Sequence, residues 1–314
     1  MHDITLANFE VDLINGSMKQ PVLLDIWAPW CGPCKQLGPV LEKLELAYAG
    51  RFKLAKLNSD DQPEIAGQLS QAFGVRSIPF CVLFIGGQPV DGFVGALPEA
   101  QVRAFLDKHV PSTDELEAEA ELGEAEALIA EGDAESALAR LQQAVAIDPA
   151  NDVARFDYVK LLLETGQLAL AEQAFAPAAS NAITDTRIDA LGRWIAAHRA
   201  AATARDAATL GAAIATNKRD FEARFELAQG HFAAGRFTEA MDELLEIVMR
   251  DKAWNQEAPR KTYVAILTLM TKPALKPSAN EPAKGALEVT GKSAAASGDP
   301  VVDQYRRKLS MALF

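Results

Sequence analysis

The sequence lacks the features that define several large classes of protein. Three cysteines in 314 residues are too few for a disulfide framework, so each is expected to be redox-active or simply buried. No apolar run approaches the ~18 residues that a membrane-spanning helix needs. The first residues, MHDITLANFE, carry acids and no long apolar stretch, which argues against a secretory signal. We therefore expect a cytoplasmic protein that does not enter a membrane.

Basic residues are outnumbered by acidic ones. Lysine and arginine number 31 against 43 aspartates and glutamates, which gives a formal charge of −12. An acidic surface repels phosphate, so nucleic acids and anionic membranes are not expected as partners. With 49% hydrophobic and 24% charged residues, the composition is that of a globular chain, and the length suggests about two domains.

Residues 1–110 alternate between strand-like and helix-like patterns. Strand-like runs occur at 21–27, 52–57, 80–85 and 90–94. Apolar residues at helical spacing occupy 34–49 and 98–109. This alternation predicts an α/β sandwich, in which helices flank a mixed sheet.

A strongly acidic stretch follows this first domain. Residues 111–140 contain ten acids and a single basic residue, Arg140. Such a break in composition predicts a domain boundary, with 111–121 as an acidic linker. A solvated helix face and a dedicated docking patch both remain open for these acids.

Residues 122–270 show a helical repeat. Gly132, Gly166 and Gly235 are spaced by 34 and 69 residues, and each is followed after five residues by alanine, after nine by a bulky apolar residue and after twelve by an apolar residue. This pattern resembles the tetratricopeptide repeat, in which small residues let two helices approach closely. We interpret 181–220 as a divergent repeat and 259–270 as a capping helix.

The C-terminal part of the chain changes character twice. Residues 271–298 are rich in Pro, Lys, Ser, Gly and Ala, which predicts a flexible linker. Residues 299–314 predict a short amphipathic helix, with Asp299 as its cap and Pro300 in its first turn. Its apolar side chains are Val301, Tyr305, Leu309 and Leu313, with Val302 beside them, and its basic ones are Arg306, Arg307 and Lys308. Such a helix either docks on the repeats or is presented to a partner's groove.

The chemistry of the chain is expected at Trp30-Cys31-Gly32-Pro33-Cys34, between a predicted strand and a predicted helix. The partial positive charge of a helix N-terminus stabilises a thiolate, so Cys31 is the expected nucleophile and Cys34 the resolving thiol. A structural metal site needs four ligands, and only Cys81 and four scattered histidines remain. Dithiol chemistry without metal or cofactor is therefore favoured. Cys81, within FCVLF, is expected to be a core thiol, although a regulatory role stays open.

Residues 1–110 resemble thioredoxin, whose active-site sequence is WCGPC. The resemblance implies that Asp25 and Lys56 assist proton removal from Cys34, although a purely structural role for Asp25 stays open. It further implies a substrate-docking rim made of Trp30, Gly32, Pro33, Ile78, Pro79 and Gly95, with Pro79 in the cis form. Phe80 departs from the family, where a smaller residue is common, and is expected to make this rim bulkier.

The whole chain resembles the chaperedoxin family of the YbbN/CnoX type, which joins a thioredoxin domain, tetratricopeptide repeats and a C-terminal segment with Tyr-Arg-Arg. The resemblance implies a redox-active co-chaperone that holds unfolding or oxidised proteins, protects their cysteines and transfers them to the chaperonin GroEL. It implies that the C-terminal helix, through Val301, Val302, Tyr305, Arg306, Arg307, Leu309 and Leu313, contacts the chaperonin. A thioredoxin reductase is a candidate partner.

The sequence leaves two alternatives to this function open. One is a dedicated reductase for a few proteins, with the repeats as its specificity arm. The other is an interaction adaptor whose cysteine pair is incidental.

Overall fold

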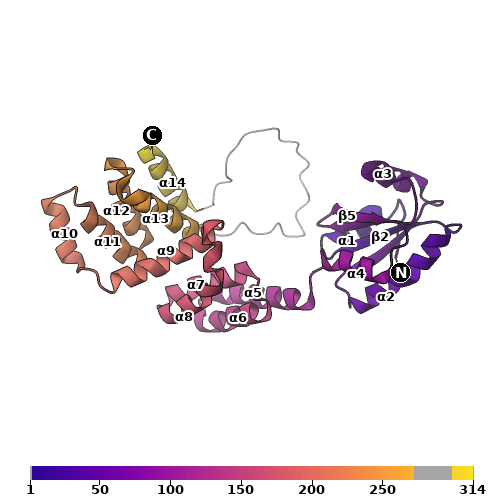
Figure 1. The fold of residues 1–314 in the computed structure, drawn as a ribbon, viewed down its shortest axis with the longest axis horizontal. Helices are drawn as coiled ribbons and strands as arrows, with labels where there is room; N and C mark the ends of the chain where they lie inside the picture. Colours follow the sequence, from indigo (N-terminus) through magenta and orange to yellow (C-terminus); the bar gives the residue numbers. More distant parts are fainter. Residues whose placement is uncertain (1, 272–298, 314) are drawn as a thin grey trace. The chain divides into compact units, whose positions relative to one another are not determined.

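The computed structural model describes residues 2–271 and 299–313. The chain divides into two compact units, of which the first comprises residues 1–116 and the second begins at Glu117 (Figure 1). The segment expected to be a flexible linker, 271–298, lies outside the described residues except for Thr271.

The first unit is built on a mixed sheet. Its strands are β1 (His2–Asp3), β2 (Val22–Trp27), β3 (Lys53–Asn58), β4 (Phe80–Ile85) and β5 (Gln88–Val94), in the order β1-β3-β2-β4-β5. Strand β3 runs parallel to β1 and β2, whereas β4 runs antiparallel to β2 and β5. The central strand, β2, ends directly before the cysteine motif.

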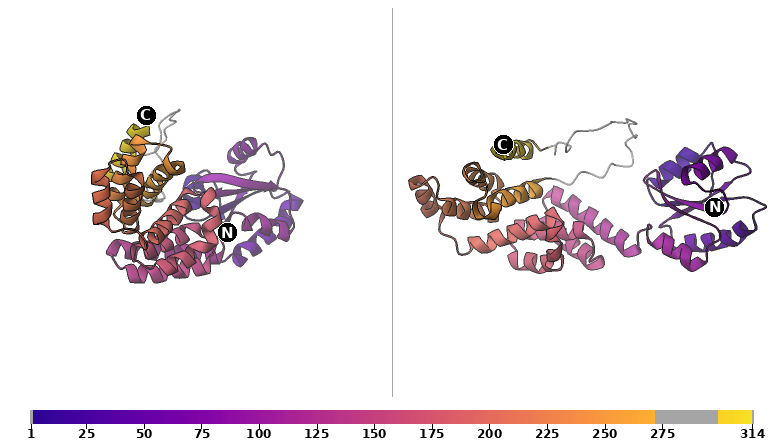
Figure 2. Two further views of the ribbon diagram at one scale, coloured as in Figure 1. Left: turned by 60° about the vertical axis from the view of Figure 1, so that its left-hand side comes forward. Right: turned by 45° about the horizontal axis from the view of Figure 1, so that its top comes forward.

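Helices cover both faces of this sheet (Figure 2). The helical segments are η1 (Phe9–Ile14), α1 (Asn15–Ser17), α2 (Gly32–Ala47), α3 (Pro63–Phe73) and α4 (Glu99–Asp107). Side chains alternate between the two faces of a strand, so Leu23 packs with α2 and α4, whereas Val22 and Leu24 pack with η1 and α3. The predicted α/β sandwich with a mixed sheet is confirmed.

The second unit is helical throughout its described residues. Its helices are α5 (Thr113–Glu131), α6 (Ala134–Ile147), α7 (Asp152–Glu164), α8 (Leu168–Phe175), η2 (Ala176–Ile183), α9 (Thr186–Ala201), α10 (Ala207–Thr216), α11 (Phe221–Ala233), α12 (Phe237–Arg250), α13 (Trp254–Met270) and α14 (Pro300–Leu313). The predicted helical array is confirmed. Residues 111–121, expected as a linker, are helical from Thr113 onward.

The predicted turn glycines end the first helix of three pairs. Gly132, Gly166 and Gly235 adopt φ values of 85°, 76° and 70°, a left-handed conformation that glycine adopts without steric cost. The alanine that follows each by five residues is completely buried. In the divergent segment, α9 and α10 are joined without such a glycine.

The predicted capping helix, 259–270, lies within α13 (Trp254–Met270). Asn255, Gln256 and Glu257 at its start have positive φ values and are not helical, so the regular helix follows them. Among the described residues, no helix is long and apolar enough to cross a membrane.

Candidate active site

Cys31 and Cys34 form a disulfide at the start of helix α2. Cys31 is the N-cap residue, and its Sγ accepts a hydrogen bond from the backbone N–H of Cys34 over 3.2 Å. The motif adopts this conformation because Pro33 can occupy the first helical turn, where no N–H is needed. The unpaired N–H groups of this turn favour negative charge, so they stabilise a Cys31 thiolate once the disulfide is reduced.

An exposed edge surrounds the two cysteines, which are themselves buried. Gly32 and Pro33 are exposed, and the Trp30 side chain is 70% exposed. The indole Nε1 of Trp30 donates hydrogen bonds to both carboxylate oxygens of Asp60, at 3.2 and 3.1 Å. Sequence reasoning missed Asp60, because no local pattern relates it to a tryptophan 30 residues away.

The loop before β4 also lies against the two cysteines. The Ile78–Pro79 peptide bond is cis, as the resemblance implied, and Ile78 packs against the cluster formed by Ala28, Cys31 and Cys34. The Gly95 N–H donates to the Pro79 carbonyl oxygen over 2.8 Å. Gly95 has a φ of 89°, a conformation in which glycine is favoured.

A buried acid lies in the sheet on the side covered by α2. Asp25 is opposite Lys56 on β3 and opposite Cys81 on β4, and the Cys81 thiol donates to Asp25 Oδ1 over 3.7 Å. Lys56 Nζ donates to Glu42 Oε1 over 2.6 Å. A Cβ built on Gly38 would lie 3.7 Å from Lys56 Nζ. Since Gly38 follows Cys34 by one helical turn, Lys56 passes beneath the helix face that carries Cys34.

Burial controls the protonation of this acid. Desolvation raises the pKa of Asp25 from 3.8 to about 6, while the positive charge of Lys56 and the hydrogen bond from Cys81 act in the opposite direction. The pKa of the Cys81 thiol is raised well above its ordinary value, mainly by burial and further by the Asp25 charge. Asp25 therefore changes its protonation near neutral pH, while Cys81 stays a thiol.

Two residues on β4 and β5 add to what the sequence suggested. Phe80, expected to make the surroundings of the cis proline bulkier, is buried and packs edge-on against Phe73 of α3, so its ring is not displayed on the surface. Gly92 on β5 was not anticipated: a Cβ there would lie only 2.7 Å from the Cys81 carbonyl oxygen. The lack of a side chain at Gly92 thus allows β5 to approach β4 next to Cys81.

Known proteins resemble the first unit of the chain, which carries the cysteine pair. A family model described as thioredoxin matches residues 1–108. The chain is 46% identical over 104 residues to "Thioredoxin" from Haemophilus influenzae and 40% identical over 107 residues to "Thioredoxin 1" from Nostoc sp.. These alignments cover 92% and 94% of the relatives, but only 33% and 34% of this chain. The chain belongs to the thioredoxin family.

The rest of the chain extends this thioredoxin domain with repeats. Two tetratricopeptide repeat models match residues 128–195 and 200–276. The protein is therefore a fusion of a thioredoxin domain, with thiol–disulfide oxidoreductase activity of the thioredoxin type, and tetratricopeptide repeats.

The C-terminal helix of this fusion docks on the repeats. Val302, Tyr305 and Leu309 are buried in the core of the second unit, and the Tyr263 hydroxyl donates to the Tyr305 carbonyl oxygen over 2.8 Å. The Tyr305 hydroxyl donates to Asp242 over 3.0 Å. Of the two placements that the sequence left open, the structure has the docked one.

The residues that α14 exposes differ in part from those that the sequence suggested for contact with a partner. Val301, expected on the apolar face, is exposed, as are Arg307 and Met311. Leu313 packs partly against the core, and Arg306 donates to Thr271 Oγ1 over 3.0 Å. A partner that meets the docked helix thus meets Val301, Arg307 and Met311.

Proposed function

We propose that this fusion protein is a redox-active co-chaperone, a chaperedoxin that works in the cytosol. It reduces or protects the cysteines of unfolding proteins, holds these clients through its repeats and transfers them to the chaperonin GroEL. The observation that carries the proposal is the joining, in one chain, of a thioredoxin disulfide to a repeat array on which a C-terminal helix is docked.

In the redox step, the Cys31 thiolate attacks one sulfur of a client disulfide. A mixed disulfide forms and the first client thiolate leaves. The Cys34 thiolate then attacks the Cys31 sulfur, which releases the second client thiolate and forms the Cys31–Cys34 disulfide found here. Two electrons pass to the client, whose disulfide becomes two thiols, and a thioredoxin reductase then supplies two further electrons that reduce the Cys31–Cys34 disulfide.

Asp25 and Lys56 manage the proton of Cys34 in this proposal. A carboxyl whose pKa is about 6 is ionised in part near neutral pH and accepts a proton at little cost. Lys56 lowers the pKa of Asp25 and lies beneath the same face of α2, so it favours the ionised form that accepts the proton. Replacement of Asp25 by asparagine should therefore slow release of the second client thiolate more than attack by Cys31.

The client is expected to meet the thioredoxin domain in an extended conformation. Trp30, Gly32 and Pro33 form one side of the docking rim. Ile78, Pro79 and Gly95 form the other side, where the backbone before the cis proline pairs with the client. The hydrogen bonds from Trp30 to Asp60 reduce the freedom of the indole, which lowers the entropic cost of binding.

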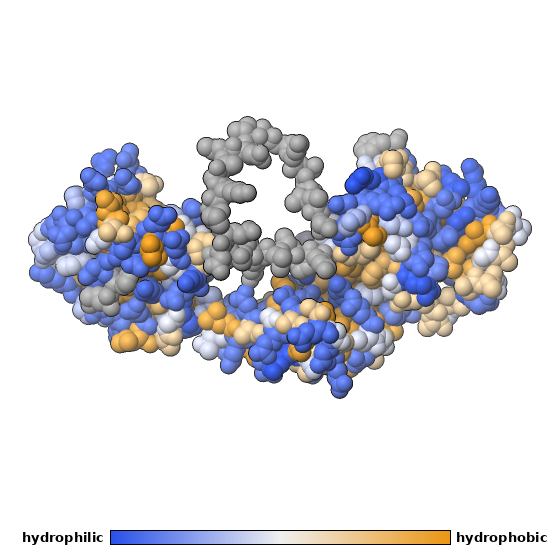
Figure 3. Space-filling model, turned by 180° about the vertical axis from the view of Figure 1, so that it is seen from behind, coloured by the Kyte–Doolittle hydropathy of each residue, from blue (hydrophilic) through white to orange (hydrophobic). Residues whose placement is uncertain are grey.

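The repeats supply the apolar contacts for holding clients. Exposed large apolar side chains of the second unit include Leu170, Ile183 and Met249. Figure 3 shows that apolar residues form small, separate groups among hydrophilic ones on the face in view. Such a surface suits weak binding to many sequences better than tight binding to one.

Transfer to GroEL is assigned to the exposed side of helix α14. Because Val302, Tyr305 and Leu309 are buried, we propose that the chaperonin contacts Val301, Arg307 and Met311. The test replaces Arg307 by glutamate and measures GroEL binding by the full chain. Arg219→Glu is the matched control, since Arg219 is also exposed but lies before α11. Loss of binding in Arg307→Glu alone supports the assignment, and equal binding by both variants contradicts it.

A Cys34→Ala variant tests the redox part of the proposal. Without the resolving thiol, mixed disulfides at Cys31 persist. The variant is expressed in the native cell, and covalent partners are identified after purification by release with reductant. Many unrelated proteins, together with GroEL bound noncovalently, support the co-chaperone. One or two covalent partners without GroEL indicate a dedicated reductase instead.

A further inference from the structure

A pocket of about 600 Å³ opens in the repeat unit, far in sequence from the cysteine pair. It lies between the end of α9, helix α11 and the start of α13. Phe225 and Trp254 contribute rings, Ala200 contributes a small side chain, and Glu222, Gln229 and Asn255 contribute polar groups. Neither the sequence pattern nor the redox function accounts for this combination.

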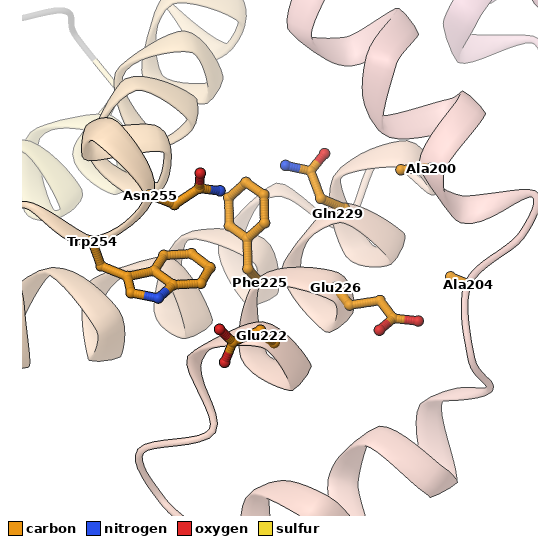
Figure 4. Close-up of a pocket in the computed structure, with 8 residues that line it drawn as sticks. All are labelled: Ala200, Ala204, Glu222, Phe225, Glu226, Gln229, Trp254 and Asn255. Carbon is orange, nitrogen blue, oxygen red and sulfur yellow. The ribbon is translucent and has the colours of Figure 1, made fainter.

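The two aromatic rings are held in place by their neighbours. Trp254 packs edge-on against Phe225, with ring centroids 5.6 Å apart, and against Phe221 at 6.0 Å. Figure 4 shows the rings of Trp254 and Phe225 side by side, with the carboxylates of Glu222 and Glu226 on one side in this view and the amides of Asn255 and Gln229 on the other. The pocket therefore offers π surface together with carboxylate and amide oxygens.

The backbone next to Trp254 is strained. Asn255, Gln256 and Glu257 have φ values of 47°, 54° and 63°, although none is glycine. The left-handed conformation costs such residues roughly 1–2 kcal/mol each. The turns after α5, α7 and α11 place glycine at left-handed positions. Strain of this kind gathers at sites that clamp a ligand, and this turn places Trp254 and Asn255 at the pocket.

The charges at the pocket identify the kind of ligand. Glu226 is already paired with Arg205, with a shortest distance of 2.6 Å, whereas the exposed Glu222 adds a carboxylate beside the rings. A guanidinium stacks on an aromatic face more readily than an ammonium and also pairs with a carboxylate. The chain as a whole carries a charge of −12, which attracts basic segments.

We propose that this pocket binds an arginine side chain, flanked by apolar residues, from an extended segment of an unfolded client. The guanidinium lies over Trp254 and near Glu222, and the aliphatic stem packs on Phe225. The remaining volume takes an adjacent apolar side chain. This proposal rests on the proposed function, since it names the sequence feature by which the repeats select clients.

The test uses a fluorescent nonapeptide with one arginine between two leucines, and a second peptide with glutamine in place of the arginine. Fluorescence anisotropy measures binding to the full chain with its disulfide intact, so that no covalent complex forms. Glu222→Gln should weaken binding of the arginine peptide by about fivefold and Trp254→Leu by about tenfold, from the usual strength of such contacts. Binding of the glutamine peptide should be weak and unchanged by Glu222→Gln.

Glu135→Gln is the matched control, because Glu135 is exposed in the first turn of α6, as Glu222 is in the first turn of α11. It changes the net charge equally, so an equal loss of binding in Glu135→Gln would reveal a general charge effect and overturn the proposal. Equal binding of the two peptides, or unchanged binding by both pocket variants, would also overturn it. Glu222→Gln removes no packing contact, which keeps the test valid if Trp254→Leu fails to fold.

A parallel assay of heat-induced aggregation of an unrelated enzyme separates the two proposals. If the wild-type chain and both pocket variants suppress aggregation equally, the pocket proposal is wrong and the holding function stands. If the wild-type chain binds the arginine peptide through Trp254 and Glu222 but leaves aggregation unchanged, the holding function is wrong and the pocket stands.

Discussion

Replacement of Asp25 by asparagine tests the electrostatics of the active site through protein stability. Asp25 is buried in the central strand, and the charged form of its carboxyl is disfavoured by the loss of hydration. Asparagine has nearly the same shape and no charge at any pH. The substitution therefore removes the cost of burying the charge while it leaves the packing of the sheet in place.

The size and sign of the effect follow from the pKa values. The folded protein raises the pKa of Asp25 from 3.8 to about 6, a difference that corresponds to about 3 kcal/mol. The native state binds the proton more tightly than the unfolded chain, so this stabilisation is complete below about pH 4 and is lost as the pH rises through about 6. Asp25→Asn should thus raise the free energy of unfolding of the thioredoxin domain by about 3 kcal/mol at pH 8 and by little at pH 4.

The assay must report on this domain separately from the repeats. Urea denaturation of the full chain, with the disulfide intact, is followed by pulsed hydrogen exchange and mass spectrometry of peptides from β2 and β4. Glu64→Gln is the control, because it removes one negative charge from an exposed position in the same domain. It should change the free energy of unfolding by only a few tenths of a kcal/mol. A gain in Asp25→Asn that is equal at pH 4 and pH 8, or absent at pH 8, would refute the reasoning.

Three further substitutions test other contacts. Cys81→Val removes the thiol donor to Asp25, so the pKa of Asp25 should rise further, which carboxyl ¹³C NMR titration measures; an unchanged value would exclude the contact. Tyr305→Phe loses the hydrogen bond to Asp242 and should speed hydrogen exchange of α14 about fivefold, corresponding to ~1 kcal/mol, while exchange in α2 stays the same. Gly92→Ala places a Cβ 2.7 Å from a backbone oxygen and should destabilise the thioredoxin domain by about 1–3 kcal/mol; thermal denaturation with an unchanged midpoint would contradict the close approach.

The sequence was sufficient wherever the physical cause is local. An apolar strand followed by WCGPC predicts a cysteine pair at a helix N-terminus, because the strand pattern, the two cysteines and the proline all lie within about a dozen residues. The turn glycines at 132, 166 and 235 predicted the helix pairs for the same reason, since each conformation depends on the residue itself.

Tertiary structure decided what depends on pairing between distant segments. Strand register places Cys81 and Lys56 on either side of Asp25, and it directs Phe80 into the core instead of toward the docking rim. The acceptor of the Trp30 indole, Asp60, also comes from another segment. The spacing of residues along the chain does not predict such contacts, because they arise from the alignment of whole strands and loops.

Two features in the C-terminal part of the repeat unit show the same division. The amphipathic pattern of 299–314 predicted a helix, but it was compatible with docking and with presentation to a partner. Docking was decided by the apolar surface of α12 and α13, which receives Val302, Tyr305 and Leu309. The left-handed turn after Trp254 was not predicted at all, since nothing local favours it. The sequence by itself determined which segments form helices and where the reactive cysteines lie, because short-range sterics and hydrogen bonding fix both. Only the packed structure decided which faces of those helices remain free to bind.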